Sequence, residues 1–370
     1  MKVIYSCAWN KEKEKTWSGT TYSLYKALKK KINIEDCDVS LNLIEKILVK
    51  ILSFRIHNFK IYSVTLYNRF KDYLIYKKVS HKKSEYQEDI ILHVGSLVGG
   101  IENSYCYIDL SMDSLEYYKD KRNDLFEYST YQNIPDNQFD YIRKIQNDKF
   151  KDLAGIFTMS KWLQNNLINY SNYPTDKVHF VGGGINVNYK DIKEMPKSKN
   201  KILFVGRDFY RKGGDILYNS FKILKEKYKK DAELYIIGPK EWPLDEKIEG
   251  VFFLGDINSS ELSYYFNSCD IFCMPSRFEA YGLVFIEALV YGLPCIGRNE
   301  FEMNQFILDG YNGYLIDNDD EEELAIKMRD LMEDDQIKQN VRNERDKYIR
   351  EYSWDTVADR MIKVFKDNVV

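Results

Sequence analysis

The sequence predicts an α/β protein with two domains, each built on a parallel β-sheet. The chain has 370 residues, and domains usually hold about 100–200 residues, so two domains are expected. Over residues 201–333, short apolar runs alternate with helical patterns, which is typical of βαβ units and a parallel sheet. The first half shows the same alternation less regularly, beginning with an apolar run at Val3–Ala8.

The second half supplies clearly bounded elements, because turn residues such as Gly238-Pro239 and Gly255-Asp256 follow its apolar runs. Strands are expected at Lys201–Val205, Glu233–Ile237, Val251–Leu254, Ile271–Met274 and Cys295–Gly297. Helices are expected at Gly214–Lys230, Ser259–Ser268, Leu283–Tyr291 and Asp319–Glu333.

The first half contains fewer clear boundaries. Strands are expected at Val3–Ala8, Ile90–Val94, Cys106–Leu110 and Ala154–Met159, and helices at Thr20–Lys31 and from Ser160 onward. Residues 187–199 are polar, include Pro196, and are interpreted as a linker between the domains.

Composition excludes several classes of protein. The net charge of −3 argues against a dedicated nucleic-acid binder, which needs a basic surface. No run approaches the roughly 20 apolar residues of a membrane span, and the first residues read as a strand and not as a signal peptide. The six cysteines lie in apolar stretches without metal-ligand spacing, so we expect buried, reduced thiols and a cytosolic protein.

The stretch 270–288 carries the most information about function. An apolar run ends at Pro275, a loop with Glu279 follows, and a helix carrying Glu287 begins after Tyr281-Gly282-Leu283. Ligands of open α/β sheets bind beyond the carboxyl ends of the strands, and a helix N-terminus favours a phosphate. Two carboxylates therefore flank a predicted anion site.

This stretch resembles the E-x7-E motif of retaining glycosyltransferases, and of family 4 in particular. Four further segments resemble that family in the same order: Ile202–Arg207 with Arg211–Gly214, Ala288–Ile296, Asp309–Ile316 and Tyr352–Asp355. The resemblance is strong over residues 201–355 and looser before them. It implies two Rossmann-like domains facing a cleft, the GT-B architecture. Residues 1–190 would form the acceptor-binding domain, residues 200–353 the nucleotide-sugar donor domain, and a C-terminal helix at 354–370 would cross back onto the first.

Sugar transfer from a nucleotide needs positive groups at the departing phosphate, because negative charge develops there. Arg207 ends a predicted strand and Lys212 lies in the next loop, which suits a two-cation clamp on a diphosphate. Solvated loop cations are the alternative, and the surrounding motif argues against it. In this family, Arg and Lys usually replace a metal, so no metal and no cofactor are expected; the nucleotide-sugar is a substrate.

The resemblance assigns the remaining site residues. Glu287 would bind the nucleotide ribose, and Glu279 would face the donor sugar or the reacting centre. Tyr281, Gly282 and Leu283 would donate backbone N–H groups. In the first domain Gly19 would approach the donor phosphate, although Thr20 or Thr21 after it also suits a helix cap.

Asp109 and His93 are acceptor-side candidates at predicted strand ends. Asp109 is equally well explained as a structural or capping residue, and His93 better as a core histidine. One departure from the family stands out. Its glycine pair and glutamate after the 295–297 strand are replaced by Glu300–Gln305, so backbone donation from that loop is open.

Residues 41–83 are strongly basic, with ten Lys and Arg against Glu45 and Asp72, and apolar side chains between them. Such a segment can lie on an anionic bilayer. Two ordinary helices packed on the sheet would give the same pattern. The charged residues are Lys46, Lys50, Arg55, Lys60, Arg69, Lys71, Lys77, Lys78, Lys82 and Lys83; the apolar ones are Leu48, Ile51, Leu52, Phe54, Phe59, Tyr62, Leu66, Phe70, Tyr73 and Leu74.

The resemblance therefore implies a cytoplasmic, metal-independent retaining glycosyltransferase. It would move a sugar from a UDP- or GDP-sugar to a glycan or lipid-linked acceptor in cell-surface polysaccharide or glycoconjugate synthesis, with peripheral membrane contact through 41–83 as an option. A nucleotide-sugar 2-epimerase and a non-catalytic sugar-binding subunit remain open. A dinucleotide oxidoreductase is disfavoured because no G-x-G-x-x-G follows the first strand.

Overall fold

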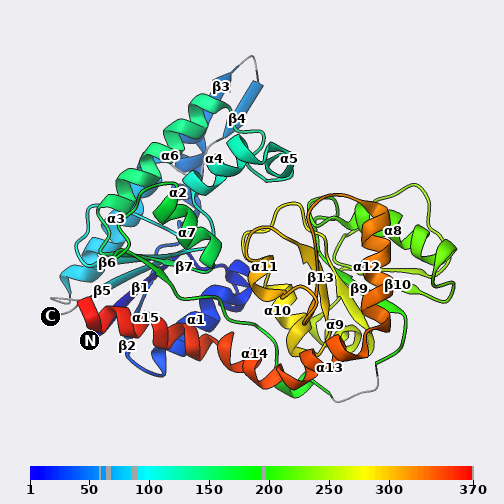
Figure 1. The fold of residues 1–370 in the computed structure, drawn as a ribbon. Helices are drawn as coiled ribbons and strands as arrows, with labels where there is room; N and C mark the ends of the chain where they lie inside the picture. Colours follow the sequence, from blue (N-terminus) through cyan, green and yellow to red (C-terminus); the bar gives the residue numbers. More distant parts are fainter. Residues whose placement is uncertain (58–59, 64–67, 86–89, 194–196, 369–370) are drawn as a thin grey trace. The chain divides into compact units, whose positions relative to one another are not determined.

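The computed structural model describes residues 1–57, 60–63, 68–85, 90–193 and 197–368. These residues form two compact α/β units (Figure 1). The first comprises residues 1–117, 133–184 and 354–370, and the second comprises residues 118–132 and 185–353. The segment 118–132, which the sequence analysis placed in the first domain, belongs to the second unit.

The first unit is built on a six-stranded parallel sheet in the order β2-β1-β5-β6-β7-β8. This is a doubly wound order, with a switch point between the first and third parallel strands in chain order. The strands are β1 (Lys2–Cys7), β2 (Asn33–Asp38), β5 (Ile90–Val94), β6 (Ser104–Ile108), β7 (Gly155–Thr158) and β8 (Val178–Phe180).

Helices cover both faces of this sheet, so its strands are buried on both sides. On one face Ile4 and Ile91 pack with Ile75 and Val79 of α3 (Arg69–Ser84). On the other face, the Tyr5 hydroxyl donates to the Thr21 carbonyl of α1 (Thr20–Lys29), at 2.7 Å. The remaining helices are η1 (Lys13–Gly19), α2 (Leu43–Ser53), α4 (Met112–Lys121, crossing the unit boundary), α6 (Asp136–Lys151), α7 (Lys161–Asn169) and α15 (Trp354–Asn368).

The C-terminal helix α15 is part of the first unit. Its Phe365 packs edge-on against Tyr105 and Phe157, with ring centroids 5.0 and 5.4 Å apart. Lys31 near the end of α1 pairs with Asp359 at 2.7 Å. The helix is therefore held by apolar contacts with the sheet and by an ion pair at its exposed edge.

The second unit has a six-stranded parallel sheet in the order β11-β10-β9-β12-β13-β14. Numbered along the chain this is 3-2-1-4-5-6, the dinucleotide-fold order, whose switch point lies between β9 and β12. The strands are β9 (Lys201–Val205), β10 (Glu233–Ile237), β11 (Val251–Gly255), β12 (Ile271–Cys273), β13 (Cys295–Arg298) and β14 (Gly313–Ile316). The helices are α5 (Asn123–Phe126), η2 (Tyr189–Asp191), α8 (Gly214–Lys227), α9 (Ser259–Ser268), α10 (Leu283–Val290), α11 (Met303–Phe306), α12 (Glu321–Glu333), α13 (Asp335–Asn343) and α14 (Arg345–Glu351).

The strands predicted in the second half match the structure within one residue at each end. In the first half, the strand predicted at Cys106–Leu110 is wrong by two residues and occupies Ser104–Ile108. The strands β2 and β14 were not predicted. Within 41–83, two helices form as one interpretation expected, but an antiparallel hairpin, β3 (Phe54–His57) with β4 (Lys60–Ser63), lies between them. Phe59 and Leu66 of that segment, and residues 194–196 of the predicted linker, lie outside the described residues.

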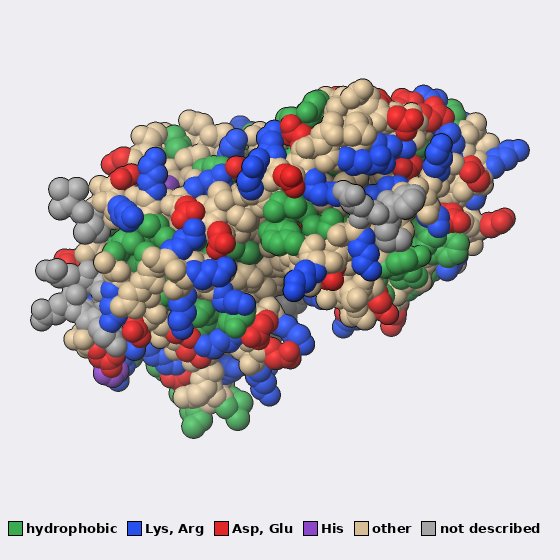
Figure 2. Space-filling model, turned by 90° about the horizontal axis from the view of Figure 1, so that it is seen from below, with side chains coloured by type: hydrophobic (Ala, Val, Ile, Leu, Met, Phe, Trp, Pro, Cys, Tyr) green, Lys and Arg blue, Asp and Glu red, His purple; other side chains and the backbone are tan. Residues whose placement is uncertain are grey.

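The cysteines and the surface agree with the composition. All six cysteines are buried and free. In the described part of the chain, no helix is long and apolar enough to span a bilayer. Figure 2 shows one face of the molecule, over which basic and acidic side chains are interspersed, as the small net charge leads one to expect.

Candidate functional site

The candidate site of the second unit lies at the carboxyl ends of β9 and β12, on either side of the switch point. The loop after β9 carries Arg207 and Lys212, and the loop after β12 carries Glu279. Gly213 lies where the two loops meet. Its φ is +72°, and a Cβ at this position would come within 2.3 Å of the Pro275 carbonyl oxygen. Only glycine allows the loops to approach this closely.

Lys212 and Glu279 form a nearly buried ion pair at the centre of this site. Their side chains are only 12% and 11% exposed. The lysine stem lies across the end of β9, since a Cβ on Gly206 would come 2.9 Å from its Cγ. Burial and the neighbouring Arg211 lower the pKa of Lys212 well below its usual value, whereas the contact with the Glu279 carboxylate favours the protonated ammonium. The buried ammonium is thus held by an ion pair with the Glu279 carboxylate.

Arg207 differs from Lys212 in being exposed. Its side chain is 81% exposed, and its Nη2 lies 3.8 Å from Asp256 Oδ1. A contact of this length at the surface contributes little to stability. The structure therefore does not join Arg207 to the Lys212–Glu279 pair, although both cations leave the same strand end.

The remaining predicted residues surround the start of α10. Gly282 is the N-cap of this helix, with φ +93°, and Tyr281 is buried against Phe306 with ring centroids 5.1 Å apart. Leu283 opens the helix, and Glu287 lies on it, partly buried. Burial raises the pKa of Glu287 to about 7, against an opposing hydrogen bond from the Asn186 backbone. When it is ionised, the Glu287 carboxylate can accept hydrogen bonds from hydroxyl groups.

This shift gives a testable pH dependence of stability. The folded protein holds the Glu287 proton more tightly than the unfolded chain, where the pKa is near 4.5, so this carboxyl favours folding below pH 4.5 and loses that effect as the pH rises through about 7. The variant Glu287→Gln cannot titrate. Its melting temperature relative to the parent should therefore rise between these pH values, by ~2–4 °C after discounting for partial exposure. A difference that stays constant with pH in calorimetry would contradict the shift.

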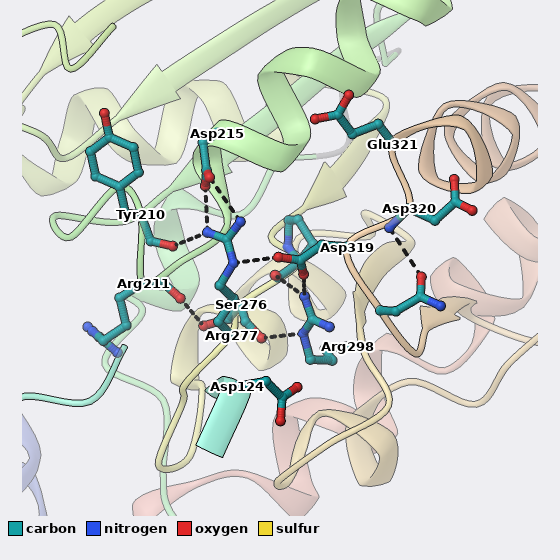
Figure 3. Close-up of polar contacts among 12 residues, drawn as sticks. Asp124, Tyr210, Arg211, Asp215, Ser276, Arg277, Arg298, Asp319, Asp320 and Glu321 are labelled. Carbon is teal, nitrogen blue, oxygen red and sulfur yellow. Dashed lines mark hydrogen bonds and ion pairs between the residues drawn. The ribbon is translucent and has the colours of Figure 1, made fainter. Parts of the chain in front are cut away.

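A network of two buried arginines and two partly exposed aspartates supports the Glu279 loop (Figure 3). Arg277 makes a bidentate contact with Asp215 of α8, at 2.7 and 2.9 Å, and its Nε donates to Asp319 at 2.7 Å. Asp319 also pairs with Arg298 at the end of β13. The two guanidinium groups are almost fully buried, with side chains 6% and 2% exposed, and the two aspartates balance their charge.

The same network fixes the backbone of the two site loops. Arg298 Nε donates to the Ser276 carbonyl at 3.1 Å, and Arg277 Nη1 donates to the Tyr210 carbonyl at 2.7 Å. Arg211 Nη1 in turn donates to the Phe278 carbonyl at 2.8 Å. The loop that holds Glu279 is thereby tied to the loop that holds Lys212. These supporting contacts were not predicted from the sequence; the signal available for them was Arg298, an arginine at the end of an otherwise apolar strand.

The loop that replaces the family's glycine pair is also fixed by side chains. Phe301 adopts a φ of +56°, which is uncommon for an aromatic residue. It is 2% exposed and stacks on Tyr118, with ring centroids 4.3 Å apart. Glu300 accepts a hydrogen bond from the Tyr118 hydroxyl at 3.0 Å and pairs with Arg122. Packing by the segment 118–132 therefore offsets the backbone strain that glycines would avoid.

In the first unit, the predicted residues lie at the carboxyl ends of β1 and β6. Gly19 has φ +88° and caps α1, and Trp17 before it packs on Tyr107 with ring centroids 6.0 Å apart. Asp109 follows β6, and burial raises its pKa to about 6. His93 is a core histidine, 1% exposed, with no partner for its ring nitrogens among the described residues; burial lowers its pKa to about 3.

The fold and this loop geometry define two Rossmann-like units, and the predicted fold class is confirmed. The chain shares the GT-B fold with WaaG, described as a glycosyltransferase involved in lipopolysaccharide biosynthesis, at a TM-score of 0.65 and 15% identity over 98% of this chain and 99% of that one. It also shares it with the Anabaena protein HepE, solved with UDP-glucose, at 0.65 and 13% over 99% and 100% of the two chains.

Residues 187–353 match the family described as "Glycosyl transferases group 1". This range falls entirely within the second unit. An uncharacterized 41.2 kDa protein from the cps region of Klebsiella pneumoniae is 37% identical over 165 residues, which cover 43% of each chain. The chain spans about half the length of the curated relatives it matches.

Proposed function

We propose that this protein is a retaining glycosyltransferase of family 4. It takes a UDP- or GDP-sugar as donor and a glycan or lipid-linked hydroxyl as acceptor, in the synthesis of cell-surface polysaccharide or glycoconjugate. The second unit holds the donor, and the first holds the acceptor. The protein acts in the cytoplasm, in peripheral contact with the membrane.

The observation that carries this proposal is the Lys212–Glu279 pair at the switch point of the group 1 domain. A buried ammonium needs a counter-ion, and Glu279 supplies it in this structure. The diphosphate of a donor is a stronger anion and would take over Lys212. Glu279 would then be released towards the sugar, and Arg207, which is exposed and weakly held, would close on the phosphate from the solvent side.

Transfer would proceed on the front face of the sugar. The bond between the anomeric carbon and the phosphate oxygen breaks, and its electron pair stays on the departing diphosphate. The acceptor oxygen bonds to the same face of that carbon, and its proton passes to the leaving phosphate. Lys212 and Arg207 stabilise the charge that develops, which is where fixed cations contribute most to rate. Glu287 holds the nucleotide ribose, and Asp109 lies on the acceptor side.

A donor screen tests the function. The protein is incubated with UDP-, GDP-, ADP- and CMP-sugars, with and without a lipid extract as acceptor source, and release of free nucleotide is followed. Release from one donor, stimulated by the extract and lost in Lys212→Met, is the expected result. A sugar converted without nucleotide release and without acceptor would indicate the 2-epimerase. Binding without any turnover would indicate a non-catalytic subunit.

Metal independence gives a separate prediction. Because Lys212 and Arg207 supply the positive charge at the phosphate, turnover should change by less than about twofold after EDTA treatment, and added Mg²⁺ should not raise it. The measurement is nucleotide release before and after chelation, followed by re-addition of Mg²⁺ or Mn²⁺. A loss restored by either ion would overturn the two-cation assignment.

A further inference from the structure

The helix α2 exposes most of its large apolar side chains, whereas an ordinary amphipathic helix buries them. Only Val49 and Ser53 among its residues are buried. Ser53 accepts from Asn68 Nδ2, at the start of α3, at 2.8 Å, so one of the two buried side chains makes a polar contact. The large aliphatic side chains point to solvent instead: Leu43, Ile44, Ile47, Leu48, Ile51 and Leu52, between 42% and 74% exposed.

The exposed residues form one ordered surface along the helix. At 100° per residue, Ile44, Ile47 and Ile51 share a stripe opposite Val49 and Ser53. On one side of this stripe, Lys50 lies about 60° from Ile47 and Lys46 about 40° farther round, towards Ser53; both lysines are exposed. The acid of the helix, Glu45, is turned inward, where it accepts from Lys78 at 3.0 Å and completes a capping box with Asn42. The outward surface of α2 is therefore apolar and cationic.

None of the residues that the structure describes covers this surface, and an apolar patch of this kind usually marks a binding site. Two occupants are compatible with aliphatic side chains, a second copy of this helix or a lipid surface. The charges of Lys46 and Lys50 favour the lipid surface. Two copies meeting face to face would bring four lysines together without an acid, whereas anionic headgroups would neutralise Lys46 and Lys50 while the isoleucines enter the acyl boundary.

We propose that α2 docks the protein on an anionic bilayer, with Ile44, Ile47 and Ile51 inserted and Lys46 and Lys50 at the headgroups. This deepens the peripheral membrane contact of the proposed function and narrows it from residues 41–83 to a single helix. The proposal rests on the proposed function in one respect: a lipid-linked acceptor would lie in the bilayer on which α2 docks. The binding test below does not depend on sugar transfer.

The test is co-sedimentation of the full-length protein with vesicles of phosphatidylcholine, alone or mixed with phosphatidylglycerol. We expect binding to the mixed vesicles only. Ile47→Glu with Ile51→Glu should weaken it at least ~10-fold, because two aliphatic insertions are lost. Lys46→Ala with Lys50→Ala should weaken it by a similar factor and reduce its salt dependence.

Matched controls come from exposed positions elsewhere. Leu308→Glu, at a leucine 51% exposed in the second unit, and Lys15→Ala with Lys151→Ala should leave vesicle binding unchanged. Circular dichroism checks that each variant is folded. Vesicle binding that survives the α2 variants overturns the proposal. So does a parent that sediments as a dimer, without vesicle affinity, and that the isoleucine variants convert to a monomer. Donor turnover without lipid is unaffected in either case, so failure here is distinct from failure of the proposed function.

Discussion

Replacing Lys212 by methionine should reduce kcat/KM for the donor by ~10²–10³, the cost of removing one fixed charge partner from a developing anion. Methionine keeps a long apolar stem to cover the end of β9 but removes the charge. Because the variant also leaves Glu279 without its main counter-ion, we expect a lower melting temperature as well. Steady-state kinetics of nucleotide release, with calorimetry on the same samples, separate the two effects.

Arg207→Met tests the same phosphate clamp without the accompanying change in stability. Its side chain is 81% exposed, so it should lose activity by a comparable factor while its melting temperature stays that of the parent. Lys227→Met is the control, since this lysine lies 53% exposed on α8 and pairs with Glu322. Full activity in both the Lys212 and the Arg207 variants would contradict the proposal that these two cations bind the diphosphate.

Replacing Arg298 by methionine should destabilise the second unit by about 2–3 kcal/mol. Breaking a buried ion pair typically costs ~3–5 kcal/mol, and the lower figure applies because Asp319, 44% exposed, can turn to solvent. The Ser276 carbonyl would lose its donor as well, so the loop carrying Glu279 would shift. We therefore expect a raised KM for the donor together with the loss of stability, measured by urea unfolding and by kinetics.

A double variant makes the Arg298 prediction specific to the network. Arg298→Met combined with Asp319→Asn should be less destabilised than the two single changes summed, because the second change removes a charge that the first left unpaired. Arg329→Met, whose arginine pairs with adjacent Asp330 on α12, should alter stability by less than ~0.5 kcal/mol. Additive effects of Arg298 and Asp319 would contradict the bridge between them.

The sequence predicted the second sheet closely because its strands are apolar on both faces and end at glycine, proline or charged residues. It also placed Lys212 and Glu279 at the ends of strands, since those positions follow from the order of elements. The ion pair between them could not be predicted from the sequence, because it depends on the close approach of the two loops at Gly213 and Pro275.

Contacts between distant residues and the orientation of helices were beyond sequence patterns. Asp319 bridges Arg277 and Arg298 from 42 and 21 positions away, and nothing local in the chain marks it as their partner. The periodicity of α2 shows that one face is apolar, but which face meets the protein depends on Ser53 contacting Asn68. The hairpin β3–β4 is short and interrupts two basic helices, so the helical pattern concealed it.

The most direct measurement of the central claim is calorimetric titration of nucleoside diphosphates, UDP and GDP first, into the parent, Lys212→Met and Lys227→Met. We expect that one diphosphate binds the parent and the Lys227 variant equally and binds the Lys212 variant at least ~10-fold more weakly, a difference of ~1.4 kcal/mol or more. Equal affinity for all three proteins would show that the diphosphate does not contact Lys212 and would contradict the site described for this unit.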